Sequence, residues 1–195
     1  MSKDHADRGP WDEDPRGLGL VLDEDRGSLP YALIHGESLV ACAAWALGES
    51  GVDLVDASVD WAAIVESGED LVLHDALCPM TPPGFIASCL AHARSTGRAV
   101  VGVRPVTDTV KIIDGGRVGD TVDRNSLLAV TSPLVVPAGV VAGLAARPVA
   151  DLARAVTDLA AGGHPVETLT SPPEARRVSS AEDVRLLGAL TSAQG

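Results

Sequence analysis

Residues 71–103, LVLHDALCPMTPPGFIASCLAHARSTGRAVVGV, place two short apolar runs on either side of a helical pattern. The runs Leu71–His74 and Ala99–Val103 have the length and aliphatic content of strands buried in a parallel sheet. Between them, Thr81 is placed to cap a helix that continues to about Ser95. A strand, a helix and a second strand in this order predict a parallel βαβ unit.

The same alternation continues on both sides of this unit. Leu18–Leu22 is predicted to be the first strand, and Ser38 is a candidate N-cap for a helix that ends at Glu49. Later patterns predict strands at 129–136, 166–169 and 177–178, and helices at 137–146, 149–161 and from Ser180 onward. The predicted fold class is α/β, with a doubly wound, mostly parallel sheet.

A different pattern interrupts the alternation at about residues 107–124, the hairpin arm. β-Branched residues in 109–113 and 117–121 flank Asp114-Gly115-Gly116, a turn that can supply positive φ. These features predict a β-hairpin. Its polar strands favour an arm that projects from the body of the protein.

The composition bounds the class of protein. A chain of 195 residues with 46% hydrophobic content is long enough for one sizeable core, so we expect a single domain over residues 17–195. Residues 1–16 are charged, hold two prolines and lack apolar periodicity, which predicts a disordered tail. The formal charge of −12, without a basic patch, disfavours nucleic acid as a partner.

The cellular surroundings are inferred from the apolar runs and the cysteines. No apolar run approaches membrane-spanning length and no charged-then-apolar leader opens the sequence, so we expect no membrane span and no secretion signal. Cys42, Cys78 and Cys89 are odd in number and lack metal-ligand spacing, as is typical of a reducing compartment. We therefore expect a cytoplasmic protein.

Residues 104–133, RPVTDTVKIIDGGRVGDTVDRNSLLAVTSP, resemble one family in residue identities, spacing and an intervening turn. The methylerythritol-phosphate cytidylyltransferases run Pro-Val-x-Asp-Thr-Val-Lys, cross a hairpin, read Thr-Val-Asp-Arg-x-x-Leu and close on Thr-Pro. Residues 72–76 are similar to the family's His-Asp-Ala-Ala-Arg-Pro strand end, and residues 177–183 to its Lys-Val-Thr-x-Pro-Glu-Asp. The resemblance covers about residues 18–191 and implies a Rossmann-like nucleotidyltransferase fold.

The resemblance also implies an activity and a set of site residues. The family transfers a cytidylyl group from CTP to methylerythritol 4-phosphate, usually with Mg²⁺, and works as a homodimer whose hairpin reaches into the partner subunit. By motif match, Asp75 would hold metal and ribose, and Thr109 and Arg124 would hold the substrate phosphate. Ser132 replaces a threonine but keeps the hydroxyl. Arg177, the candidate catalytic residue, replaces a lysine but keeps the charge.

Several positions depart from the family pattern. Its Gly-rich turn, which holds the triphosphate, is replaced by residues 23–29 (DEDRGSL), where three acids stand and Arg26 is a candidate remnant of the loop arginine. The family's catalytic lysine is Tyr31, and the arginine after His-Asp-Ala-Ala is Cys78. The segment that reads the cytosine has no counterpart between residues 55 and 70. These losses predict little turnover of CTP.

Each candidate residue also has a structural interpretation. Asp75 can instead cap the following loop, while Thr109 and Arg124 can serve only the hairpin and dimer contacts. Cys78 is either a reactive thiol or a small buried residue. His74 is either a catalyst or a structural histidine. The sequence leaves these alternatives open.

Three functional hypotheses remain. In the first, which is our working hypothesis, the chain is a catalytically impaired homologue that acts as a binding or partner subunit. It would bind a small phosphorylated ligand, and would pair with a second copy through the hairpin arm or with a complete paralogue. In the second, it is an active cytidylyltransferase that uses Mg²⁺. In the third, it is a nucleotidyltransferase with another substrate.

Overall fold

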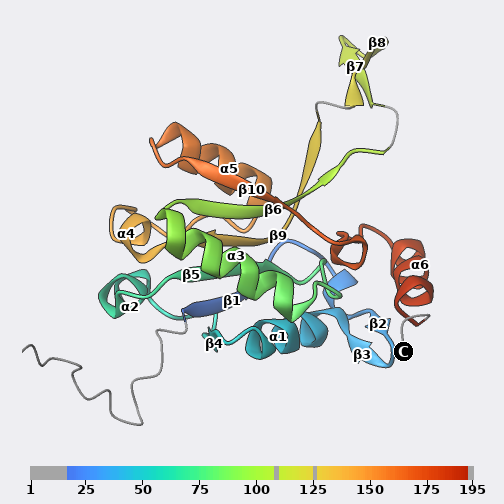
Figure 1. Cartoon of the computed structure of the whole chain (residues 1–195). Coiled ribbons are helices and arrows are strands. Elements are labelled where there is room, and N and C mark those ends of the chain that lie inside the picture. Colours follow the sequence, from blue (N-terminus) through green and yellow to red (C-terminus); the bar gives the residue numbers. More distant parts are fainter. Residues whose placement is uncertain (1–16, 108–109, 125–126, 193–195) are drawn as a thin grey trace, which may run out of the picture.

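A central sheet organises the part of the chain that the computed structural model describes, residues 17–107, 110–124 and 127–192; the predicted tail, residues 1–16, lies outside it (Figure 1). Six strands lie in the order β10-β6-β9-β5-β1-β4. Their bounds are β1 Leu18–Leu22, β4 Asp53–Leu54, β5 Leu71–Asp75, β6 Ala99–Pro105, β9 Leu128–Val136 and β10 Val166–Thr170. β9 runs antiparallel to β5 and β6, and the other neighbouring pairs are parallel. The predicted α/β sheet is confirmed.

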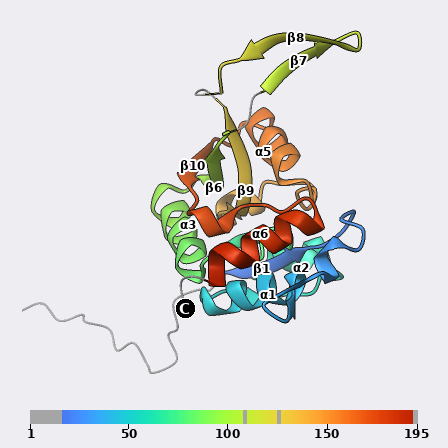
Figure 2. The same ribbon diagram turned by 90° about the vertical axis from the view of Figure 1, so that its right-hand side faces the viewer.

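Helices cover both faces of this sheet (Figures 1 and 2). α1 (Leu39–Glu49) and α3 (Pro83–Thr96) lie on one face, and α2 (Trp61–Ser67), α4 (Ala138–Val141) and α5 (Leu152–Ala161) lie on the other. α6 (Ala181–Ser192) packs against Leu77, just beyond the end of β5. Within the described residues, no helix has the length and apolar content needed to cross a membrane.

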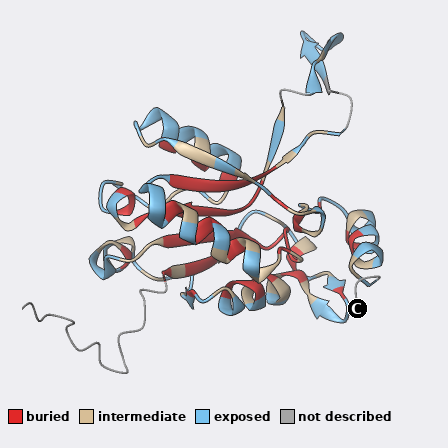
Figure 3. Ribbon diagram, viewed as in Figure 1, coloured by how far each residue is buried: buried red, intermediate tan, exposed pale blue. Residues whose placement is uncertain are grey.

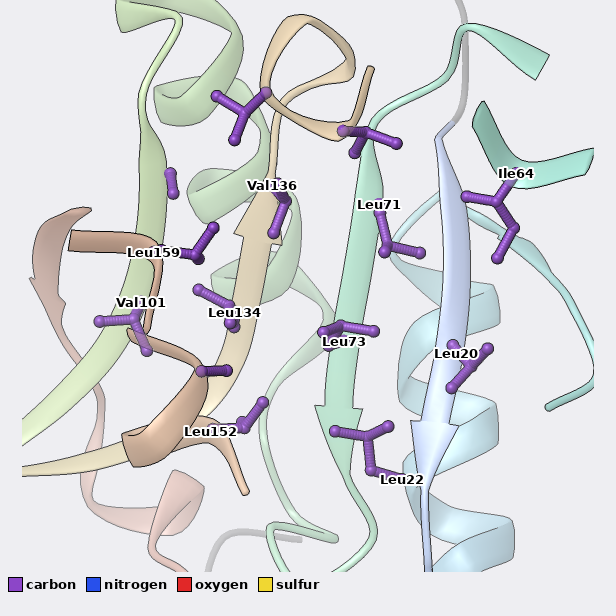
Figure 4. Packing of buried hydrophobic residues seen from close by; sticks show 14 of the residues in the cluster. Leu20, Leu22, Ile64, Leu71, Leu73, Val101, Leu134, Val136, Leu152 and Leu159 are labelled. Carbon is purple, nitrogen blue, oxygen red and sulfur yellow. The ribbon is translucent and has the colours of Figure 1, made fainter. Parts of the chain in front are cut away.

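The burial pattern follows from this layering. Every residue of β5 is buried, as its continuous apolar run predicts for a strand covered on both faces (Figure 3). On one face, Leu20, Leu73 and Leu134 of the sheet pack with Leu152 and Leu159 of α5 (Figure 4). The sheet is thus packed on both faces, and its edge lies next to a well-packed core.

Residues next to α1 and α3 set the start of α1 and the end of α3, whereas the start of α3 differs from the prediction. The Ser38 side chain accepts a backbone N–H of the first turn of α1 at 3.3 Å, and Gly97 ends α3 in the left-handed conformation. The predicted cap of α3 is wrong. Thr81 is buried and its hydroxyl donates to the Cys78 carbonyl at 2.9 Å, so the N-cap position falls to Pro82.

The helices after β9 are shorter than predicted. α4 ends at Val141 instead of continuing to residue 146. Gly139 and Gly143 weaken a longer helix there, because glycine costs about 1 kcal/mol relative to alanine in a helix. α5 begins at Leu152, where the Asp151 side chain accepts a backbone N–H of the first turn at 3.0 Å.

The predicted strand at residues 177–178 does not form. The backbone N–H of Val178 donates to the Leu77 carbonyl at 2.8 Å, which fastens this extended segment beyond the end of β5 without a ladder. Six elements of the described chain were not predicted: β4, α2, η1 (Leu29–Tyr31), β2 (Leu33–Ile34), β3 (Glu37–Ser38) and η3 (Pro173–Ala175).

The hairpin arm forms as predicted. β7 (Val110–Asp114) and β8 (Arg117–Val122) pair antiparallel, and Gly115 and Gly116 supply the turn with φ of +52° and +78°. Figures 1 and 2 show the pair extending away from the sheet and its helices. The arm leaves Ile113 63% and Val118 70% exposed.

Candidate functional site

The carboxyl ends of β1 and β5 meet at one edge of the sheet, because the two strands are parallel. β9 runs the opposite way beside β5 and brings Thr131 and Ser132 to the same edge. Ligands of open α/β sheets bind outside the carboxyl ends of the strands. The candidate site is therefore built around the last residue of β5, Asp75.

The Asp75 carboxylate is held by two arginines, and the three side chains form the Asp75 cluster. Arg26 donates from Nε to Oδ1 and from Nη2 to Oδ2, both at 3.3 Å, and Arg177 donates from Nε to Oδ2 at 3.0 Å. The Leu77 N–H adds a bond to Oδ1 at 2.9 Å, which caps the turn after β5. Arg26 Nη2 also donates to the Ala150 carbonyl at 2.9 Å.

A buried pair of polar side chains, His74 and Ser132, lies next to Asp75 and bonds to its backbone through Ser132. Ser132 Oγ accepts the backbone N–H of Asp75 at 3.0 Å and lies 2.5 Å from Nδ1 of His74. Both side chains are fully buried, and Nε2 of His74 has no hydrogen-bond partner among the described residues. Burial lowers the pKa of His74 to about 4, against a smaller opposite effect of Asp75, so the imidazole is neutral near pH 7.

A cavity of about 260 Å³ opens beside the cluster. It is lined by Arg26, Asp75, Val130, Thr131, Asp151, Leu152, Ala153 and Arg177. Two guanidinium groups and two carboxylates face one another here, but they differ in exposure. The Arg177 side chain is 40% exposed, whereas those of Arg26 and Asp75 are 10% and 5% exposed. Arg177 is therefore the cation of the cluster that an incoming anion can reach.

The acid loop, residues 23–29, turns its one basic residue inward. Asp25 and Gly27 both have positive φ, which curls the loop back toward the sheet. Glu24 pairs with Arg147 at 3.4 Å, and Arg26 reaches Asp75. The loop thus presents carboxylates on the outside and keeps its only cation inside.

Tyr31 and Cys78 are uncharged at the two positions where the resemblance predicts basic residues. Tyr31 is 63% exposed, and its hydroxyl donates to Asp23 Oδ2 at 3.3 Å. Cys78 is fully buried, and burial, followed by the nearby charge of Asp75, raises the pKa of its thiol. Neither side chain offers a positive charge to a phosphate group.

The two candidate residues of the hairpin arm are not part of the Asp75 cluster. Arg124 is exposed and donates from Nη1 to the Thr107 carbonyl at 2.6 Å, which closes the base of the arm. Thr109 lies outside the described residues. Of the predicted site residues, the structure therefore brings together Asp75, Ser132 and Arg177.

The residues present do not fit a divalent metal ion. Both oxygens of Asp75 accept hydrogen bonds from guanidinium groups, and Oδ1 of the other lining carboxylate, Asp151, caps α5. Mg²⁺ needs several oxygen ligands in a near-octahedral arrangement. No group of three or more His, Cys, Asp or Glu side chains in the described ranges is arranged to hold a metal.

Sequence reasoning missed what Arg26 does and the roles of Ala150 and Asp151. The resemblance identifies Arg26 only as a candidate remnant of the loop arginine. A stronger signal was available, since it is the sole basic residue between β1 and Tyr31 and lies in a loop that begins at the carboxyl edge of the sheet. Nothing in the sequence marks a backbone carbonyl such as that of Ala150 as a ligand.

Comparison with known proteins gives a consistent result. The family model described as 2-C-methyl-D-erythritol 4-phosphate cytidylyltransferase matches residues 48–185. A protein of that name from Rhodococcus jostii is 30% identical over 176 residues, which are 88% of this chain and 73% of the relative. One from Corynebacterium glutamicum is 40% identical over 120 residues, 60% of this chain and 43% of the relative. This chain spans about half the length of several such relatives.

Solved structures match over nearly the whole fold. The cytidylyltransferase of the same name from Thermus thermophilus has a TM-score of 0.64 and 21% identity, covering 89% of this chain and 98% of its own. A structure of 4-diphosphocytidyl-2C-methyl-D-erythritol synthase has a TM-score of 0.68 at 18% identity, covering 92% and 100%. These likenesses establish the fold.

Proposed function

Because the chain belongs to the 2-C-methyl-D-erythritol 4-phosphate cytidylyltransferase family, we propose that it binds a small phosphorylated ligand and acts as a binding or partner subunit with little turnover of CTP. One observation carries the proposal. The loop after β1 exposes carboxylates where a triphosphate would need cations, and its single arginine is bound to Asp75.

The chemistry of nucleotidyl transfer supports impairment. Such reactions depend on positioning and on neutralising the phosphate oxygens, since the protein supplies little covalent help. Loss of one preorganised donor costs about 3 kcal/mol, or 10²–10³ in rate. Losing a lysine, an arginine and the glycine nest together would cost on the order of 6 kcal/mol or more, even if the effects are not additive.

The phosphate side of the site is better preserved. Arg177 is the accessible cation of the Asp75 cluster, and Arg124 is exposed at the base of the hairpin arm. A guanidinium group suits a phosphate monoester because it offers parallel donors to two oxygens. The ligand we propose is therefore a small phosphate ester, with methylerythritol 4-phosphate as the first to test.

We also propose that the hairpin arm pairs with a second chain. An isolated two-stranded ribbon is marginally stable in water and needs a surface to pack on. Ile113 and Val118 are opposite one another across the arm, and both are exposed. A twofold dimer with crossed arms would cover them, and a complete paralogue would do so equally well.

Calorimetric titration tests this function. CTP with Mg²⁺ should bind no tighter than millimolar, about −4 kcal/mol, whereas methylerythritol 4-phosphate should bind measurably and lose affinity in Arg177→Gln. A pyrophosphate-release assay with both substrates should give no signal above the blank. Micromolar binding of CTP, or steady release of pyrophosphate, would instead establish an active cytidylyltransferase, which the gathering of Asp75, Ser132 and Arg177 also favours.

A further inference from the structure

We infer that Arg26 is a built-in cation at Asp75 and replaces a divalent metal, so that the site takes a phosphate ester without any metal ion. The nature of the ligand rests on the proposed function above. The exclusion of the metal rests first on the contacts of Arg26, and the charge of Arg177 and the engagement of Asp151 reinforce it; it can be tested without any ligand.

Arg26 and Asp75 form a bidentate pair. Arg26 places Nε on one oxygen of Asp75 and Nη2 on the other, at 3.3 Å each. This bidentate approach covers the edge of the carboxylate, which is the edge that a cation would have to occupy. A metal can bind Asp75 there only after Arg26 has left.

Burial and a further hydrogen bond keep Arg26 in place. Its side chain is 10% exposed, and Nη2 donates a further bond to the Ala150 carbonyl at 2.9 Å. Leaving Asp75 would therefore also leave a nearly buried guanidinium without its counter-charge, which is costly. The acid loop holds Arg26 from one side and the segment before α5 holds it from the other.

The cavity also offers few other ligands for a metal ion. Arg177 donates to Asp75 Oδ2 at 3.0 Å, so a second positive charge would repel any ion at this carboxylate. Asp151 is the other carboxylate of the cavity, and its Oδ1 is engaged at the start of α5. A hard cation that needs six oxygen ligands finds too few here.

The protein itself, and not a metal ion, supplies the positive charge that meets the ligand's phosphate group. In a metal-dependent site the ion is recruited together with the phosphate, and affinity depends on metal concentration. Here the positive charge of Arg26 is fixed by the fold and balances Asp75, while Arg177 remains accessible to the anion. Phosphate-ester binding should therefore be the same with and without divalent ions.

The decisive experiment titrates the full chain with Mn²⁺ and measures free ion by electron paramagnetic resonance. Wild type should bind no Mn²⁺ up to about 1 mM, the weak end of protein sites for divalent ions. Arg26→Gln should raise Mn²⁺ affinity at least about tenfold, the gain expected when a competing charge leaves the carboxylate. Adding Asp75→Asn to this variant should remove the gain.

Two further variants guard against misfolding and general charge effects. Arg26→Lys keeps a positive charge and should exclude Mn²⁺ as wild type does. Arg98→Gln removes an arginine from the surface pair with Glu167, far along the chain from the cluster, and should leave Mn²⁺ binding unchanged. Binding of Mn²⁺ by wild type that is lost in Asp75→Asn, or a folded Arg26→Gln that gains nothing, would overturn the inference.

A parallel calorimetric titration with methylerythritol 4-phosphate separates the two proposals. Affinities in EDTA and in Mg²⁺ that agree within about twofold support a metal-free site, since a difference that small is below 0.5 kcal/mol. A gain of tenfold or more with Mg²⁺ would overturn it. If the ester does not bind under either condition, the proposed ligand is wrong, and the Mn²⁺ titration still decides the role of Arg26.

Discussion

Asp75 and Arg26 of the Asp75 cluster are nearly buried in the body of the molecule, whereas the hairpin arm is exposed along most of its length. The cluster joins segments that are 49 and 102 residues from Asp75 in sequence, and each contributes a hydrogen bond to it. The arm is held mainly by pairing between its own two strands. Both regions carry the residues on which the family resemblance rests.

The difference shows which of the two regions is complete within one chain. The cluster needs no second molecule, because every oxygen of Asp75 is already satisfied inside the fold. The arm exposes the apolar side chains of Ile113 and Val118, and no other part of the described chain buries them. Substitutions in the cluster should therefore change the free energy of unfolding, and substitutions in the arm should change association with a second chain.

The largest effect is expected from Asp75→Ala. It leaves Arg26 nearly buried without its counter-charge and removes the cap on the Leu77 N–H, so unfolding should become easier by about 3 kcal/mol or more. Urea denaturation measures the change. Asp158→Ala is the matched control, since its pair with Arg154 is exposed and should contribute less than about 1 kcal/mol. Equal losses in both variants would show that the buried pair contributes no more to stability than the exposed one.

A smaller effect is expected from pH, through His74. Its pKa in the folded state, about 4, lies below the ordinary 6.5, so the unfolded chain takes up the proton first. The stability is therefore complete above pH 6.5 and is lost as pH falls toward 4. The slope is about 1.4 kcal/mol per pH unit, which gives about 2 kcal/mol between pH 7 and pH 5.

Urea denaturation at a series of pH values checks this. His74→Asn removes the titration and should flatten the profile between pH 7 and pH 5. His35→Asn, at an exposed position whose positive φ asparagine tolerates, should keep the wild-type slope. A His74→Asn profile as steep as that of wild type would show that another group is responsible.

The smallest effect on stability is expected in the arm. Ile113→Ser with Val118→Ser removes apolar side chains that are exposed in one chain, so the free energy of unfolding of the body should change by less than about 0.5 kcal/mol. The same change should shift a dimer toward monomer in sedimentation at micromolar concentration. Replacing residues 114–118 with a short Gly-Ser link should do so completely.

Two outcomes would contradict self-association through the hairpin arm. A wild-type chain that sediments as a monomer would leave the exposed face of the arm unexplained by self-association. A dimer that survives deletion of the hairpin tip would place the interface elsewhere on the molecule.

Much of the fold could be predicted because its signals are local. The run Leu71–His74 is buried on both faces, Gly97 ends α3, and Gly115-Gly116 makes the hairpin turn, each for a reason visible within a few residues. The cap of α3 could not be predicted in this way. Thr81 satisfies the carbonyl of Cys78 in the turn after β5, and that competing bond appears only once the chain is folded.

The candidate site was harder to predict for the same reason. Asp75, Ser132 and Arg177 follow from matched motifs, but the partners of Asp75 depend on how loops distant in sequence come together. Arg26 is chosen over other cations because the acid loop curls back at Asp25 and Gly27 and so delivers it to the end of β5. Residues 177–178 predict a strand because the run is short and β-prone. Nothing in it indicates that the segment will instead bond to Leu77 beyond the end of β5.

The double attachment of Arg26 has one more consequence. The Asp75 carboxylate and the Ala150 carbonyl tie together the loop after β1, the segment before α5 and the extended segment at Arg177. None of these stretches can open to solvent without breaking bonds to another. In a hydrogen-exchange experiment their amide protons should behave as one cooperative unit, exchanging together and more slowly than those of the hairpin arm.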